Sequence, residues 1–170
     1  MVESRDVAEH LLSCFDAVYV GLGECAPTLG TDAYVVRVHE MARSFGGVAL
    51  ELREYVGRGE VAPLAVIREV LDQALAKDPS GAMTLFAMAL VVGPRLLVSL
   101  RDAREGLGPD AELRTICERA AQVTVQQLLQ IANTTQHHED IDDPGWQEGA
   151  RRLTQLVESA GNAESFGISR

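Results

Sequence analysis

Apolar residues recur at intervals of three and four along most of the chain, and this is the spacing of positions that share one face of an α-helix. The first such stripe lies between residues 4 and 22, the second between 38 and 56, and the third between 64 and 75. Charged residues fall between the apolar positions of each stripe. The pattern therefore predicts three amphipathic helices in the first half of the chain, each of which buries one face.

Glycines and prolines mark the expected ends of these helices. The glycine-rich stretch 21–30 follows the first stripe, so we expect a helix C-terminus and a loop there. Thr31 fits the N-cap of the second helix. Pro63 fits the first turn of the third helix, and Asp78-Pro79 fits its end.

Three features of this half leave alternatives open. Gly46-Gly47 lies inside the second stripe, where a glycine weakens a helix by about 1 kcal/mol, so a kink is expected there. Residues 16–20 and 34–38 are rich in strand-forming side chains, and a short antiparallel strand pair is an alternative to helix for them. Residues 21–26 have the G-x-G-x-x-A spacing of a dinucleotide-binding turn, but too few residues follow for the helix that would hold a pyrophosphate.

Residues 82–100 are nearly all apolar, with Arg95 as the one charge and Gly93-Pro94 in the middle. No polar face remains to meet water, so the segment is predicted to be a buried central helix or a kinked helix pair. A membrane span has this length, but it would place a proline and an arginine at mid-depth. We therefore favour a core helix and expect no membrane partner.

Two more amphipathic stretches complete the pattern. Residues 111–133 pair an apolar face with a glutamine-rich face, and residues 144–160 begin after Asp143, which fits an N-cap. Residues 161–170 have no periodicity and are expected to form a loose tail. With no repeat and no linker, residues 1–160 are predicted to form a single all-α domain, a bundle of six or seven helices around the hydrophobic central segment.

The charge of the chain bears on its partners and its origin. Fifteen basic residues against 25 acidic ones give a net charge of −10, and such a surface repels phosphate, so nucleic acid is not an expected partner. Lys77 is the only lysine among the basic residues, a bias that indicates a GC-rich bacterial genome. No secretory signal opens the sequence and the three cysteines lack disulfide or zinc spacing, so a cytoplasmic protein is expected.

Two groups of polar residues are candidates for metal sites. Residues 137–143 hold two histidines and four carboxylates, but their spacing departs from a calcium loop, which favours a solvated acidic loop. His10 and His39 have no glutamate three positions earlier, so the di-iron pattern fails. A looser polar site from Asp6, His10, His39 and Glu40 stays an alternative to histidines that pair with nearby carboxylates. We expect no metal and no cofactor.

Arg95 is the strongest candidate for a ligand-binding residue. A charge in an apolar helix must be paired or must line a polar cavity, because an unpaired buried ion costs several kcal/mol. A structural partner, such as a carboxylate or the carbonyls of a helix end, is the favoured interpretation. The alternative is an anchor for an anionic ligand group in a cleft whose walls are Met83, Phe86, Met88 and Leu97.

Two classes of function follow from these residues. The first is a non-enzymatic, acidic binding protein that recognises a protein partner or an apolar or anionic small molecule, with a homo-oligomer as an open alternative to a monomer. The second is a helical-bundle enzyme, with or without a metal, whose internal pocket uses Arg95 with the histidines and carboxylates named above. The absence of any assembled catalytic motif favours the first.

Overall fold

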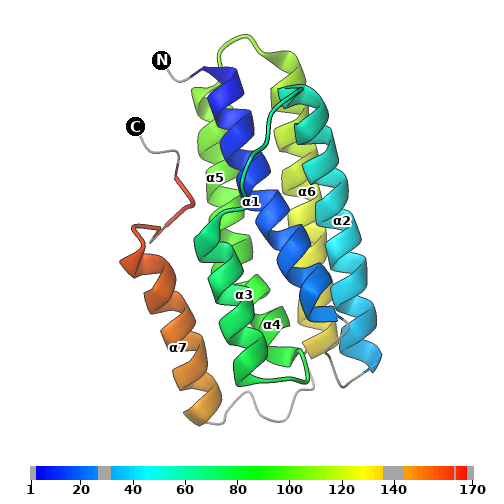
Figure 1. Cartoon of the computed structure of the whole chain (residues 1–170), viewed down its shortest axis with the longest axis vertical. Helices are drawn as coiled ribbons and strands as arrows, with labels where there is room; N and C mark the ends of the chain where they lie inside the picture. Colours follow the sequence, from blue (N-terminus) through cyan, green and yellow to red (C-terminus); the bar gives the residue numbers. More distant parts are fainter. Residues whose placement is uncertain (1–2, 27–31, 136–143, 163, 168–170) are drawn as a thin grey trace.

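The computed structural model describes residues 3–26, 32–135, 144–162 and 164–167, and over these residues the protein is an all-α bundle without strands. The prediction of an all-α, single-domain bundle is therefore confirmed. The elements in chain order are α1 (Ser4–Cys25), α2 (Asp32–Val56), α3 (Ala65–Lys77), α4 (Ala82–Ala87), the π-helical turn η2 (Met88–Val92), α5 (Gly93–Gly106), α6 (Ala111–Thr135) and α7 (Pro144–Ser159). Figure 1 shows the long helices aligned in one bundle, with α7 along its outer side.

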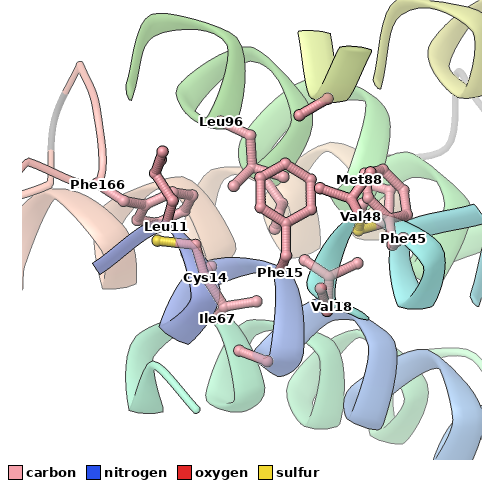
Figure 2. Packing of buried hydrophobic residues seen from close by; sticks show 14 of the residues in the cluster. Leu11, Cys14, Phe15, Val18, Phe45, Val48, Ile67, Met88, Leu96 and Phe166 are labelled. Carbon is pink, nitrogen blue, oxygen red and sulfur yellow. The ribbon is translucent and has the colours of Figure 1, made fainter. Parts of the chain in front are cut away.

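α1 lies at the centre of the packing and contacts α2 along its length and α3 on another side. The rings of Phe15 and Phe45 lie 5.8 Å apart across the α1–α2 interface, and Figure 2 shows them with Met88 in the same core. Buried residues of every α-helix belong to a single hydrophobic cluster. The helices therefore share one core, as expected of a domain of this size.

α1 is longer than its sequence pattern predicts. It continues through Gly21 and Gly23 to Cys25, so the helix ends within the glycine-rich stretch but a few residues later than the glycines indicate. A Cβ at Gly21 would lie 2.6 Å from Leu71 Cδ1, which shows that this glycine permits close packing of α1 on α3. The strand-pair alternative is wrong, because residues 16–20 and 34–38 are both helical. The proposed cap at Thr31 lies outside the described residues.

Two further local expectations need correction. α2 is helical without interruption through Gly46-Gly47, and a Cβ at Gly46 would lie 2.8 Å from the ring of Tyr19. The first of these glycines therefore makes room for an aromatic side chain of α1. α3 begins at Ala65 instead of Pro63, because the preceding chain bonds to α1: Leu64 N–H donates to the carbonyl of Ser13 over 3.0 Å.

Residues 82–106 form one continuous helical rod in which α4 and α5 are joined by the π-turn. Pro94 explains the turn, because proline has no N–H for the carbonyl four residues earlier and its ring clashes with that carbonyl in a regular α-helix. The wider π-turn accommodates the ring, and Gly93 N–H bonds to the carbonyl of Met88, five residues earlier. The predicted kinked pair thus takes the form of an α-π-α rod.

The apolar composition of the rod predicts burial on every side. The structure instead leaves one side of the rod exposed. Leu90 is 57% exposed and Pro94 is exposed, because none of the helices in the described residues covers this face of the rod. Among the described residues, this rod is the one helix with the length and hydropathy of a membrane span, and 67% of its most apolar window is buried inside the bundle. A core helix has the same properties, so the pattern is weak grounds for a membrane location.

The chain beyond α7 differs from the expected loose tail. α7 ends in a Schellman motif: Gly161 has a positive φ of 80°, its N–H bonds to Glu158, and Asn162 N–H bonds to Val157. A few residues later, the side chain of Phe166 is completely buried in the common core. The described part of the tail is therefore fixed to the bundle by an aromatic anchor that periodicity could not reveal.

Candidate functional site

An apolar groove lies between the rod and α7. Its volume is about 140 Å³, and its walls come from α4, the π-turn and the middle of α7. The lining residues are Met83, Phe86, Ala87, Leu90, Val91, Ala150, Arg151, Leu153 and Thr154.

The sequence builds this groove through one close contact and one aromatic pair. At Gly149 the backbone of α7 approaches the rod, since a Cβ there would lie 3.0 Å from Met83 Cε. Nearby, the rings of Phe86 and Trp146 meet edge to face with their centroids 5.2 Å apart. These contacts fix α7 against α4, and the π-turn then presents Leu90 at the open side of the groove.

The rim of the groove carries little free charge. Arg151 forms an ion pair with Glu148 over 2.5 Å, one turn earlier on α7. Glu148 also accepts from Arg152 at 3.1 Å, and this hydrogen bond together with the charges of both arginines lowers its pKa. Two arginines thus share one carboxylate. Arg151, the charged residue that lines the groove, is ion-paired, and the apolar floor suits an apolar group better than an ion.

The structure separates the five residues predicted to form an anion-binding cleft. Met83 and Phe86 line the groove, but Met88 is fully buried in the core. Leu97 is half-buried on α5, beyond the groove. Arg95 is 7% exposed and does not line the groove either.

Arg95 faces the C-terminal segment. Its Nε donates to the carbonyl of Asn162 over 2.8 Å, and its Nη1 donates to the carbonyl of Val91 over 3.0 Å. Asn162 directly follows the C-terminal end of α7, where the helix dipole attracts positive charge and where α7 has no basic residue of its own. These contacts match the structural interpretation of Arg95, with helix-end carbonyls as its partners.

The alternative polar set of Asp6, His10, His39 and Glu40 is spread over two helices. His10 lies early on α1 and His39 early on α2. Phe15 packs against Phe45 in this antiparallel pair, and that register places the two histidines roughly eleven or more positions apart along the axis, or at least about 16 Å. Asp6 and His39 are exposed, and Glu40 pairs with Arg37. His10 instead contacts the carbonyl of Phe166 through Nε2 at 2.5 Å.

Metal-ligating and nucleophilic groups form no site within the part of the chain that is described. No three His, Cys, Asp or Glu side chains there are arranged to hold a metal ion. Residues 137–143, the acidic loop weighed above, lie outside the described residues. Burial raises the pKa of the Cys14 thiol to about 12, and burial is also the main cause that raises Cys25 and Cys117 to a pKa of about 11. All three thiols are thus protonated near neutral pH and are weak nucleophiles.

A second hollow, of about 430 Å³, lies between α2 and α6. Three glutamates line it, and one of them, Glu51, pairs with Arg119 at 3.3 Å. At its edge the Tyr55 hydroxyl donates to Asp110, which also caps α6 by accepting from Leu113 N–H over 3.0 Å. This hollow is open and charged, so water solvates its side chains individually.

The sequence pointed to part of the groove and missed the rest. The sequence predicts that Met83 and Phe86 line a cleft. It also predicts that Leu90 lies in the core, and it gives no indication that residues of α7 line the groove. Gly93-Pro94 was the available signal, because a proline inside a helix predicts a local rearrangement and π-turns occur often at functional sites. Comparison of the chain with protein-family models, with curated proteins and with solved structures finds no match.

Proposed function

We propose that this protein is a non-enzymatic binding protein that receives an apolar side chain of a protein partner in the groove between the π-turn and α7. The observation that carries this proposal is the groove itself, with Leu90 more than half exposed beside it. Exposed leucines occur elsewhere on the surface, but Leu90 is the one among them that lines this apolar groove, and a concave apolar surface is where binding sites are most often found.

The size of the groove favours a protein side chain over a small molecule. Pockets for small molecules commonly measure about 300–1,000 Å³. The groove measures about 140 Å³, close to the engineered cavity of about 150 Å³ that holds a single benzene ring. One aromatic or branched side chain fills it, and further affinity has to come from the surrounding surface.

The net charge of −10 supports a neutral or basic partner, because a negative surface steers such a partner toward it. The enzyme alternative has less support. It needs Arg95 and the histidines in one pocket, whereas Arg95 and His10 both bond to carbonyls of the C-terminal segment and His39 lies on another helix.

The proposal is tested by titrating the protein with N-acetyl-phenylalaninamide and following backbone amide shifts by NMR. We expect shifts that saturate and that centre on Leu90 and Leu153. An Ala150→Phe variant fills the groove and should abolish them, whereas Leu50→Phe, at a site on α2 that is 54% exposed, should leave them unchanged. Equal shifts in wild type and Ala150→Phe would rule the groove out as the binding site.

A further inference from the structure

A slot between α1 and α5 holds both the side chain and the backbone of Phe166. The ring is completely buried, and Figure 2 shows it beside Leu11 and Cys14 of α1. The N–H of Phe166 donates to Ser99 Oγ over 2.9 Å, and its carbonyl accepts from His10 Nε2 over 2.5 Å. The slot therefore contacts the ring, the backbone N–H and the backbone carbonyl of Phe166.

The polar side chains of the slot are suited to a peptide backbone. Because a carbonyl oxygen only accepts, His10 Nε2 carries the proton of its bond to Phe166. The Ser99 oxygen accepts from Phe166 N–H, and its one proton is within hydrogen-bond distance of two carbonyls, that of Arg95 at 2.8 Å and that of Phe166 at 3.1 Å. An apolar pocket combined with partners for the backbone N–H and C=O is how many domains bind an extended peptide.

The segment that fills the slot is held at few points. Arg95 bonds to Asn162, and Ser99, one helical turn later, bonds to Phe166, so the segment runs alongside α5. Glu164 and Gly167, on either side of the anchor, are exposed. Burial of the phenylalanine side chain alone favours the docked segment by roughly 10- to 100-fold, and we expect the segment to open locally without unfolding of the bundle.

We propose that this slot is a peptide-binding site for a short extended segment with a central aromatic residue. Its ligand in the structure is residues 164–167 of the same chain, and it accepts the same segment from a second copy of the chain when its own segment opens. The chain's own segment competes at a high effective concentration because it is tethered, so the wild-type protein disfavours the exchange. This slot is separate from the groove between the π-turn and α7 and does not depend on the function proposed for that groove.

The experiment uses a synthetic peptide of residues 161–170 and full-length ¹⁵N-labelled protein. In a Phe166→Ala variant the slot is vacated, and the peptide is expected to shift the amides of Ser99 and Cys14 in a saturable way. Wild type and the control variant Glu164→Ala, which changes an exposed side chain and keeps Phe166, should bind the same peptide at least tenfold more weakly. A peptide in which alanine replaces phenylalanine should not bind.

A second substitution tests the backbone contacts. Ser99→Ala, added to Phe166→Ala, removes the partner of the peptide N–H and should weaken peptide binding several-fold. If circular dichroism shows that Phe166→Ala does not fold, Phe166→Leu replaces it, since leucine keeps much of the apolar volume. A folded variant that gives no shifts at the slot overturns the proposal, and so does equal binding by wild type and variant.

Discussion

The guanidinium of Arg95 and the backbone carbonyl of Asn162 form a 2.8 Å hydrogen bond that ties α5 to the end of α7. Arg95 is buried, and the structure gives it carbonyl partners at Asn162 and Val91. A buried cation is thus stabilised by the negative end of a helix and by directed hydrogen bonds. The result is a structural clamp on the segment that carries Phe166.

Removal of this clamp should lower stability. Arg95→Met keeps much of the apolar volume and removes the hydrogen bonds to Asn162 and Val91, so we expect the free energy of unfolding to fall by about 1–3 kcal/mol. Urea denaturation measures this change. The freed segment should also expose Cys14, whose sulfur lies 3.8 Å from His10 Nε2, and iodoacetamide should label it faster. An Arg95→Met variant as stable as wild type would point back to a ligand-binding role.

The exposure of the π-turn is tested by a pair of leucines on the rod. Leu90 is 57% exposed and Leu96 is fully buried. Leu90→Asp should change the free energy of unfolding by no more than about 0.5 kcal/mol, whereas Leu96→Asp should cost several kcal/mol because it buries a polar group. Melting temperatures of the two variants decide the matter, and a large loss from Leu90→Asp would show that this face is covered.

A pH dependence follows from the bond between Tyr55 and Asp110. Burial and this hydrogen bond raise the pKa of Tyr55 to about 12, while the bonds from Tyr55 and from Leu113 N–H lower the pKa of Asp110 below its ordinary value of 3.8. At pH values just below 3.8 the unfolded chain therefore takes up this proton before the folded one does. The stability from Asp110 is complete above about pH 5 and is lost as the pH falls through the lowered folded-state pKa.

Tyr55→Phe should weaken this dependence. We expect a loss of about 0.5–1.5 kcal/mol at neutral pH, because one hydrogen bond disappears, and a smaller further loss on acidification than in wild type. Urea denaturation at pH 7 and pH 3 gives both values. Identical acid sensitivity in the two proteins would contradict the assignment of the lowered pKa to Tyr55.

The helices could be predicted because the signals for them are local. α6 starts directly after its cap residue, Asp110. α7 starts at a proline, Pro144. In both helices the signal for the start lies at the start itself. The end of α1 could not be predicted in this way, because Gly21 serves a contact with Leu71, fifty residues later.

The candidate sites depended even more on distant contacts. Phe166 is an isolated apolar residue in a polar segment, and no periodicity indicates that it belongs to the core. The partners of Arg95 are backbone carbonyls, which every residue has, so no side chain in the sequence identifies them. Leu90 lies on a side of the rod that no described helix covers, whereas the composition of the segment predicts burial.

The most direct test of the proposed function is site-specific photo-crosslinking in the native host. The photoreactive residue p-benzoylphenylalanine replaces Leu90 in one variant and Leu50 in a control, two leucines with nearly equal exposure of 57% and 54%. The account predicts a discrete crosslinked protein species from position 90 alone, which disappears when Ala150→Phe fills the groove. No species from position 90, or the same species from both positions, would contradict the proposal that this groove binds a protein partner.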